Sequence, residues 1–225
     1  DNGEEIPCNL VGVAVGVVPR VELARGTPIR VNRGIVVDRH METTVPGVFA
    51  CGDVAEAYDF VYDSYRVVAI WPNAYIGGRI AGLNMAGASY EYDGCTNMNS
   101  FSYFDLALAS AGLFDPGPDE SVQTITMGSN GDYKKVVLRD GRVVGFLLLG
   151  RIEPAGVLFH LMRDRTPVAA FQDRLLEDGF GLASLPRPLR EAWLQNGHRP
   201  GRPDGIGEGR AGLGAEQETI PGSGD

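Results

Sequence analysis

The sequence is poor in the residues that most reactive sites need. Its 225 residues include only three histidines and three cysteines, and the cysteines form no C-x-x-C pair and no metal-ligand spacing. No nucleophile–base pair and no P-loop motif is visible. These absences argue against hydrolases, metalloenzymes and P-loop nucleotidases. The low cysteine usage fits a reducing compartment, so we expect a cytoplasmic protein.

The sequence also lacks long apolar runs and an excess of positive charge. No run approaches the roughly 18 apolar residues of a transmembrane helix. The first residues do not show the charged and apolar regions of a signal peptide. The net charge of −9 argues against nucleic acid as a partner, because such proteins need a basic patch. The 44% hydrophobic content is that of a globular protein with one or two domains.

The strongest chemical signal is a run of ten residues, 44–53. Pro46-Gly47 indicates a turn, and residues 48–51 predict a short buried strand. Gly52 permits an unusual backbone angle or a close approach to a ligand. Asp53 follows at the carboxyl end of that strand, where open α/β sheets bind ligands. Its carboxylate could accept hydrogen bonds from polyol hydroxyls, or it could simply cap a turn.

This run resembles the second flavin-binding motif of the pyridine nucleotide-disulfide oxidoreductase family. In that family a threonine, a short apolar strand and a Gly-Asp pair close the FAD site, and the aspartate binds the ribitol. The resemblance implies that role for Asp53, with Gly52 allowing the approach. It also places Thr44 and Val54 among the cofactor-binding residues.

The flanks of the motif extend the resemblance. Residues 10–18 are nearly all apolar and β-branched, which predicts a strand buried on both faces. Residues 10–20 resemble the strand and turn where the family's NAD domain returns to its FAD domain. Residues 34–38 resemble the short strand that follows. The match covers residues 6 to about 88, in the family's order and spacing.

A helix is predicted to begin at Pro72, since proline lacks the N–H that a first helical residue leaves unpaired. Ile76, Ile80 and Leu83 recur at helical spacing and predict one buried face. Glycine inside a helix is unfavourable, so its repeated use here indicates close backbone packing. The glycines are Gly77, Gly78 and Gly82.

The start of this helix is the second part of the predicted site. Its unpaired N–H groups and the positive end of its dipole can stabilise an anion. In the resembled family this end faces the N1/C2=O edge of the flavin, where the reduced ring carries negative charge. We therefore expect the backbone N–H groups of Asn73 and Ala74 to bind the flavin. An ordinary surface helix is the alternative.

No G-x-G-x-x-G follows a strand in this sequence, although the family uses two such turns, for FAD and for NAD(P). We therefore expect the carboxyl-terminal part of a flavoprotein, whose partner is an upstream FAD/NAD-binding segment or subunit. The family's His-Pro-Thr acid–base motif is absent too, so no catalytic residue is expected here. Cys51 is expected to be a core residue and His160 a helix-face residue.

From residue 121 the pattern changes to β-hairpins. Asp140-Gly141 between two apolar runs predicts a type I′ turn, and Pro154 predicts the start of an amphipathic helix. Residues 139–145 and 155–158 resemble the carboxyl-terminal domain of the rubredoxin-reductase and NAD(P)H-nitrite-reductase branch. Residues 199–225 are rich in glycine and poor in apolar residues, which predicts a disordered tail.

The expected fold class is α/β plus α+β: a remnant of a Rossmann-like FAD/NAD(P)-binding domain, followed by a small hairpin-and-helix domain. Residues 1–88 would hold the end of the NAD(P) domain and the second half of the FAD-binding domain. Residues 89–198 would form a carboxyl-terminal domain for dimerisation or for capping the flavin. Residues 199–225 would be the tail.

The resemblance implies an FAD-dependent oxidoreductase that passes electrons from NAD(P)H through FAD to an acceptor that the sequence does not identify. It implies FAD as cofactor, NAD(P)H as co-substrate, no metal, and an electron-acceptor protein or a second copy of the chain as partners. One alternative is a non-catalytic subunit or fragment that serves in dimerisation or complex assembly, which the missing glycine-rich turns favour. Another is an assembly module whose tail docks a partner.

Overall fold

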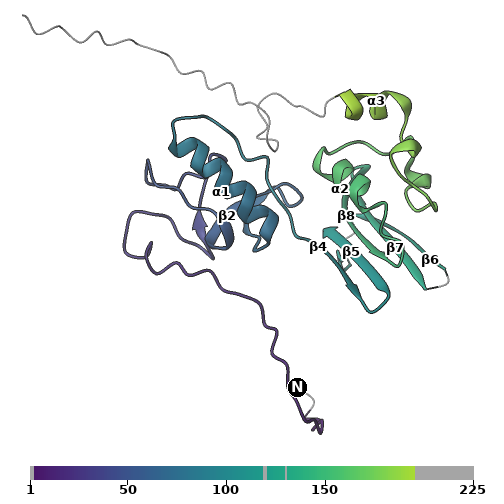
Figure 1. The fold of residues 1–225 in the computed structure, drawn as a ribbon, viewed down its shortest axis with the longest axis horizontal. Coiled ribbons are helices and arrows are strands. Elements are labelled where there is room, and N and C mark those ends of the chain that lie inside the picture. The colour runs from purple at the N-terminus through teal and green to yellow at the C-terminus, as the bar shows by residue number, and fades with distance from the viewer. Residues whose placement is uncertain (1–2, 119–120, 130, 196–225) are drawn as a thin grey trace, which may run out of the picture.

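A computed structural model of the chain describes residues 3–118, 121–129 and 131–195. It contains two separate sheets, each with helices packed beside it (Figure 1). The first half holds β1 (Ile35–Val36), the 3-10 turn η1 (Gly52–Val54), β2 (Ala55–Asp59), β3 (Ser64–Val67) and α1 (Trp71–Met85). The second half holds β4 (Met98–Tyr103), β5 (Leu106–Gly112), β6 (Gln123–Ser129), β7 (Asp132–Arg139), β8 (Arg142–Leu149), α2 (Ala155–Arg163), η2 (Gln172–Arg174), η3 (Leu182–Ser184) and α3 (Arg187–Gln195).

The first sheet is small and mixed, in the order β1-β2-β3. β1 pairs with β2 in parallel, and β2 pairs with β3 as an antiparallel hairpin. The short strand expected within residues 34–38 is therefore confirmed as β1, which covers Ile35–Val36. Glu56, only 8% exposed, ties the sheet to the preceding turn, since its carboxylate accepts hydrogen bonds from the backbone N–H groups of Arg33 and Gly34, both at 3.1 Å.

The helix α1 begins one residue before the predicted Pro72. Its buried side consists of Gly77, Ile80 and Ala81, whereas Ile76 is 45% exposed, so the predicted Ile76–Ile80–Leu83 face is rotated. Close backbone packing is confirmed at Gly77, where a Cβ would lie 3.1 Å from Met41 Cε. Gly78 also faces a neighbour, the sulfur of Cys51. Gly82 faces open space, so packing does not explain that glycine.

The second sheet is antiparallel, in the order β4-β5-β8-β7-β6. The predicted turn between β7 and β8 is confirmed: Asp140 and Gly141 have φ values of 50° and 67°, as a type I′ turn requires. One face of the sheet is covered by α2, whose Leu158, Leu161 and Met162 are almost fully buried, as the predicted amphipathic helix implies. β4 and β5 form a hairpin, with Phe104 in the turn at φ 51°.

The turn between β2 and β3 connects the two halves. Phe60 and Val61 belong to the buried core of the second half. Arg165, which follows α2, donates hydrogen bonds to Tyr58 Oη (2.8 Å) and to the Phe60 carbonyl (3.0 Å). Phe60 therefore packs in the protein interior between the halves, whereas Tyr65 on β3 is 43% exposed.

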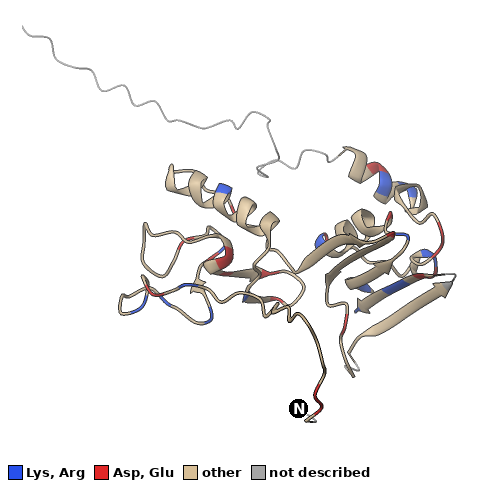
Figure 2. Ribbon diagram, turned by 60° about the horizontal axis from the view of Figure 1, so that its bottom comes forward, with Lys and Arg blue, Asp and Glu red and all other residues tan. Residues whose placement is uncertain are grey.

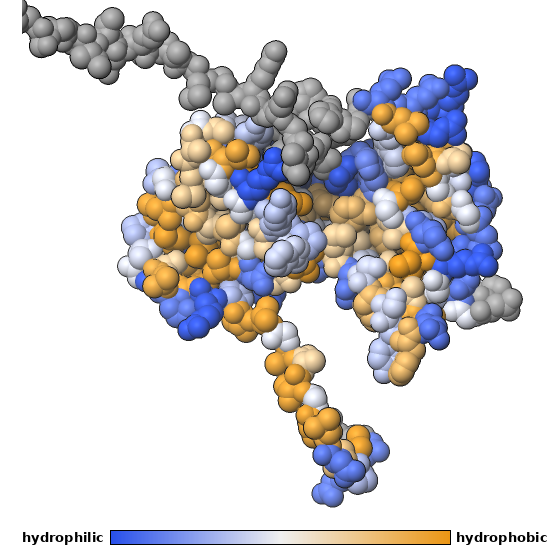
Figure 3. Space-filling model, viewed as in Figure 1, coloured by the Kyte–Doolittle hydropathy of each residue, from blue (hydrophilic) through white to orange (hydrophobic). Residues whose placement is uncertain are grey.

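Two predicted strands are wrong. Residues 10–18 are extended but pair with no strand among the described residues, and their side chains are exposed (Val15, 89%), as the apolar arm in Figure 3 shows. A strand buried on both faces needs neighbours that this part of the chain does not supply. Residues 48–51 form only one isolated bridge, Glu42–Phe49, around the confirmed Pro46-Gly47 turn.

The proposed boundary between residues 88 and 89 stays a prediction. Tyr92 and Cys95, which follow it, pack in the core of the first half. The predicted tail, residues 199–225, lies outside the described residues. None of the helices in the described part of the chain is long and apolar enough to cross a membrane.

Candidate functional site

The predicted cofactor residues Gly52 and Ala74 are brought together although they are 22 positions apart in sequence. The backbone of η1 runs beside the first turn of α1. Gly52 has a φ of 76°, which L side chains rarely adopt, and a Cβ there would lie 3.8 Å from the Ala74 Cβ. Gly52 therefore lets the chain turn sharply where it runs beside the start of α1.

Asp53 is the exposed middle residue of this turn. Its carboxylate makes no hydrogen bond or ion pair with another described residue, so its oxygens are open to an external donor. Val54, the next residue, is half-buried, and its carbonyl would lie 2.6 Å from a Cβ at Gly34. The turn thus holds Val54 against the sheet and leaves the Asp53 side chain exposed. A group that binds a polyol has to be accessible in this way.

Thr44 has a structural role in the loops before the turn. Its hydroxyl accepts a hydrogen bond from the Arg30 backbone N–H (2.8 Å) and donates one to the Pro28 carbonyl (3.1 Å). These bonds tie two loops together and occupy the hydroxyl. The structure therefore does not bring Thr44 together with Gly52 and Asp53 through any contact that it describes.

The start of α1 has no side-chain cap and no acidic residue in its first turn. The Ala74 N–H donates to the Ile70 carbonyl at 3.2 Å, so the prediction that this amide faces a ligand needs correction. Because the helix begins at Trp71, Ala74 is the first residue whose N–H can donate to a carbonyl four residues earlier. That carbonyl belongs to Ile70, the residue before the helix. Among the described residues, the amides of Trp71 and Asn73 have no acceptor.

The side chain of Asn73 also holds this helix start in place. Its Nδ2 donates to the Val68 carbonyl at 3.1 Å, which fixes the segment that leads from β3 into α1. Trp71 is 83% exposed beside it, and Figure 2 shows few charged residues along the helix. An uncapped, positive helix end with an exposed aromatic residue is a surface that an anionic planar group could contact.

A buried polar cluster lies behind the start of α1. Asp59 is fully buried and accepts hydrogen bonds from the Val61 N–H (3.0 Å), Arg66 (3.4 Å) and Thr96 (3.4 Å). Burial raises the pKa of its carboxyl above the usual value despite these partners. Burial also raises the pKa of the Cys95 thiol to about 11, which keeps it protonated and unreactive at neutral pH.

These residues fit one part of an FAD site. The unengaged Asp53 carboxylate suits the ribitol hydroxyls, the backbone at Gly52 carries no Cβ, and the open start of α1 suits the electron-rich edge of the ring. The pyrophosphate and the nicotinamide cofactor would each need a glycine-rich turn directly after a strand, and no G-x-G-x-x-G follows a strand among the described residues. The described residues thus fit only one part of such a site.

Sequence reasoning missed the residues that connect α2 to the start of α1. Phe159 and Arg163 lie on α2 and line a cavity together with Pro72 and Asn73. Their i, i+4 spacing places them on one face of α2, beside the core-facing stripe. That spacing was the only signal in the sequence that could have identified them.

Comparison with known proteins finds two domain families in the chain. The family model for pyridine nucleotide-disulphide oxidoreductase matches residues 1–78, and the model for the rubredoxin NAD+ reductase C-terminal domain matches residues 98–166. NADH-rubredoxin oxidoreductase of Clostridium acetobutylicum is 38% identical over 150 residues, covering 67% of this chain and 38% of that protein. NADH-dependent phenylglyoxylate dehydrogenase subunit epsilon of Aromatoleum evansii is 30% identical over 179 residues, covering 78% and 42%.

The fold is likewise that of known reductases. A NAD-dependent persulfide reductase from A. fulgidus matches with a TM-score of 0.63 and 28% identity, over 72% of this chain and 33% of the solved chain. The chain spans about two fifths of the length of the two relatives named above. With these two models matched one after the other, the chain carries a pyridine nucleotide-disulphide oxidoreductase domain followed by a rubredoxin NAD+ reductase C-terminal domain.

Proposed function

We propose that this chain is the carboxyl-terminal part of an FAD-dependent NAD(P)H oxidoreductase. The observation that carries the proposal is the Gly52–Asp53 turn seated against the uncapped start of α1. FAD, when bound, accepts a hydride from NAD(P)H and passes electrons to an acceptor. The chemistry belongs to the cofactor, so the chain's own residues need only bind and orient it.

Two groups of this chain would hold FAD. Asp53 would accept hydrogen bonds from the ribitol hydroxyls, with Gly52 and Val54 shaping the backbone around it. The amides of Trp71 and Asn73 would lie against the pyrimidine edge, where the positive end of α1 favours negative charge. Ala74 would contribute its small side chain next to Gly52 rather than its N–H.

The proposed partners follow from the incomplete FAD site. An upstream FAD/NAD-binding segment or subunit would supply the phosphate-binding turns. Since a relative is an NADH-rubredoxin oxidoreductase, we propose that the acceptor is a small redox protein of that kind, in the cytoplasm. A homodimer through the carboxyl-terminal domain, residues 89–198, is the further partner that we propose.

A visible spectrum tests the cofactor site. The chain is mixed with FAD, alone and together with the upstream segment of its parent protein, and passed through gel filtration. In the sample that contains the upstream segment, we expect flavin absorbance at about 450 nm to elute with the protein. Asp53→Ala should weaken this retention, while Asp105→Ala, an exposed aspartate in the β4–β5 turn, should not. Full retention by Asp53→Ala would refute the role of Asp53.

A second candidate is a non-catalytic subunit that serves in complex assembly. The exposed apolar arm at residues 10–18 favours it, because such a surface needs a partner chain to cover it. A curated relative is itself a dehydrogenase subunit. Absence of flavin from both samples, together with a stable complex in gel filtration, would select this candidate over the enzyme.

A further inference from the structure

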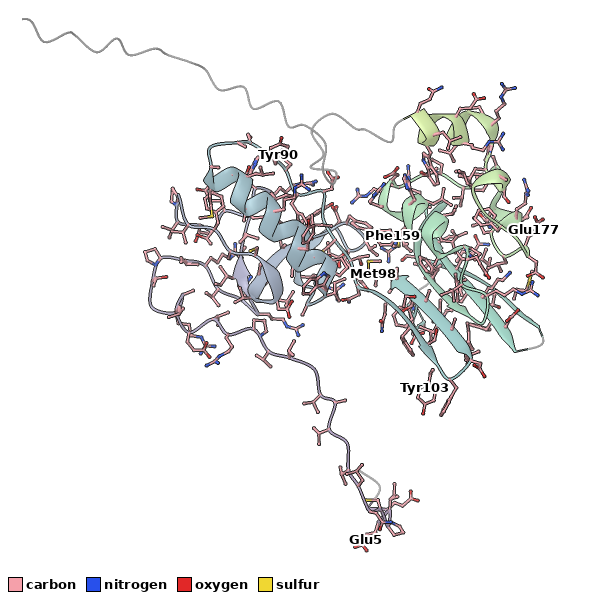
Figure 4. The ribbon with its side chains drawn as sticks, in the orientation of Figure 1. Glu5, Tyr90, Met98, Tyr103, Phe159 and Glu177 are labelled. Carbon is pink, nitrogen blue, oxygen red and sulfur yellow. The ribbon has the colours of Figure 1, made fainter. Side chains whose placement is uncertain are left out.

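A cavity of about 500 Å³ lies between three turns from different parts of the chain. They are the turn between β2 and β3, the turn between β7 and β8, and the turn that follows α2. The cavity is therefore at the junction of the two halves, where Figure 4 shows Phe159 of α2. Its volume is within the range of small-molecule sites, and none of its lining residues belongs to the proposed flavin site.

Three arginines line this cavity, although the chain as a whole has a net charge of −9. Arg139 and Arg142 are directly opposite each other in the β7–β8 hairpin, and Arg165 follows α2. Like charges directly opposite each other destabilise a strand pair, and an anion bound beside them relieves that repulsion. Arg139 has an interaction of its own, so Arg142 and Arg165 are the two that concern a ligand.

Arg142 is exposed, and its guanidinium is oriented by one backbone contact. Its Nε donates to the Arg165 carbonyl at 3.0 Å. Its Nη1 and Nη2 have no hydrogen-bond or ion-pair partner among the described residues. Both terminal nitrogens therefore keep their N–H donors for a ligand, and no carboxylate of the described chain neutralises this cation.

Arg165 is held at the opposite wall through a single nitrogen. Its Nη2 donates to the Phe60 carbonyl (3.0 Å) and to Tyr58 Oη (2.8 Å), and lies 3.5 Å from Asp63 Oδ1. Its Nε and Nη1 have no partner among the described residues. Asp63 is 76% exposed and also accepts a hydrogen bond from Tyr58 Oη at 2.5 Å, so its pairing with Arg165 is weak.

The backbone of Arg165 is in a conformation that favours glycine. Its φ is 50°, and its N–H donates to the Met162 carbonyl at 3.1 Å, while the Thr166 N–H donates to the Leu161 carbonyl at 2.9 Å. These two bonds form a Schellman motif, in which glycine usually takes the left-handed position. An arginine here costs backbone strain, which points to a role for its side chain.

Two carboxylates, Asp63 and Asp140, also line the cavity. Asp140 is exposed in the β7–β8 turn, so both carboxylates are at the solvent side, where water and salt screen them. Their charge opposes an anion without closing the cavity to it. Removal of one of them therefore gives a direct measure of where an anion binds.

We propose that this cavity binds a small phosphate ester, whose phosphate group is held by the guanidiniums of Arg142 and Arg165. A phosphate group offers several acceptor oxygens, and planar guanidinium groups bind such oxygens in pairs. The cavity is larger than a phosphate group, so the organic part has room beside the half-buried Val144. The site uses neither Asp53 nor the start of α1, and it does not depend on the proposed flavin chemistry.

Calorimetry on the full chain without FAD tests the proposal, with phenyl phosphate as the probe and neutral phenol as its matched analogue. We expect phenol to bind about tenfold more weakly or less, since it loses the charge-assisted hydrogen bonds. Inorganic phosphate should also bind more weakly, because it leaves the rest of the cavity empty. Equal binding of phenyl phosphate and phenol, equal binding of the two phosphates, or no binding of phenyl phosphate would overturn the proposal.

Arginine variants identify the groups that bind the probe. Arg142→Gln should weaken binding of phenyl phosphate about tenfold, and Arg142→Lys, which keeps the charge without the planar fork, should weaken it less. Arg165→Gly suits the backbone and should weaken binding as Arg142→Gln does. Arg25→Gln removes the same charge from an exposed position outside the lining and should bind like the unmodified chain. Unchanged binding by Arg142→Gln, or an equal loss in Arg25→Gln, would contradict the proposal.

A pair of aspartate variants locates the phosphate without touching an arginine. Asp140→Asn should strengthen binding of phenyl phosphate, and asparagine also tolerates the φ of 50° at this position. Asp105→Asn makes the same change of charge in the β4–β5 turn, outside the lining, and should leave binding unchanged. The same affinity in both variants would place the phosphate outside this cavity and refute the proposal.

Competition with FAD separates this site from the proposed flavin site. In the sample that contains the upstream segment, saturating FAD should leave the affinity for phenyl phosphate unchanged. Displacement of the probe would mean that FAD itself occupies the cavity, and the proposal of a separate site would fail. Failure of FAD to bind at all would refute the proposed function and leave this one standing, because phenyl phosphate is measured on the chain without FAD.

Discussion

The two halves of the chain differ in how far they complete their own cores. In the second half, five antiparallel strands and α2 enclose side chains such as Val136, Leu158 and Leu161, which are fully buried. In the first half, β1 is two residues long, and residues 10–18 expose one apolar side chain after another. The first half thus depends on contacts that the described chain does not contain, whereas the second half satisfies its own.

The difference follows from sequence separation. β4–β5, β6–β7 and β7–β8 are hairpins, so each strand finds its partner a few residues away. β1 and β2 run parallel, and a parallel pair needs a long connection and cover on both faces. A chain can therefore complete a hairpin domain alone more easily than a Rossmann-like half-domain.

The largest expected effect is a matched pair of leucine truncations. Leu158→Ala removes a fully buried side chain from the core of the second half and should cost about 2–5 kcal/mol of unfolding free energy. Leu10→Ala removes a side chain that is 88% exposed and should change it by less than about 0.5 kcal/mol. Urea unfolding measures both. Similar losses in the two variants would mean that residues 10–18 are packed in solution and would remove the contrast between the halves.

The next prediction concerns the polar group that holds the first half together. Glu56→Ala leaves the Arg33 and Gly34 amides without their acceptor, and a buried amide left unpaired costs about 1–3 kcal/mol. Hydrogen exchange should therefore accelerate in β1–β3 and stay unchanged in β4–β8. Glu153→Ala, an exposed glutamate in the second half, is the control. Faster exchange throughout both sheets would show that the halves unfold as one unit.

A fall in pH should change the stability of the two halves in opposite directions. Burial alone would raise the pKa of the Asp164 carboxyl, but hydrogen bonds and charge from His160 and Arg163 outweigh it and lower the pKa to about 2. Because the folded pKa lies below the ordinary 3.8, this carboxylate stabilises the second half above pH 3.8 and less so as the pH falls toward 2. Asp59, with its raised pKa, stabilises the first half at low pH and less as the pH rises.

Urea titrations followed by amide spectra at pH 5 and pH 2.5 test this prediction. We expect the second half to lose stability at pH 2.5, and Asp164→Asn to reduce that loss. The same change in Asp164→Asn and in the unmodified chain would show that the contacts of Asp164 with His160 and Arg163 do not form in solution.

The sequence predicted well where structure is set by neighbouring residues. Asp140-Gly141 adopts the type I′ turn, and Pro154 directly precedes α2. It failed for residues 10–18, because an apolar strand pattern does not tell which chain supplies the neighbours. It also missed Phe159 and Arg163, since their cavity forms only when α2 meets α1.

The smallest expected effect compares two glycines of α1. Gly82 faces open space, so Gly82→Ala should stabilise the helix by about 0.5–1 kcal/mol, which is the usual gain of alanine over glycine. Gly77 is buried, and a Cβ there would lie 3.1 Å from Met41 Cε, so the same gain is offset by the movement that Met41 must make. Thermal unfolding of the two variants measures the difference. If Gly77→Ala stabilised the chain as much as Gly82→Ala, the close packing of α1 on the loop that carries Met41 would be absent in solution. The start of α1 would then not be held beside Gly52, and the arrangement on which the proposed flavin site depends would fail with it.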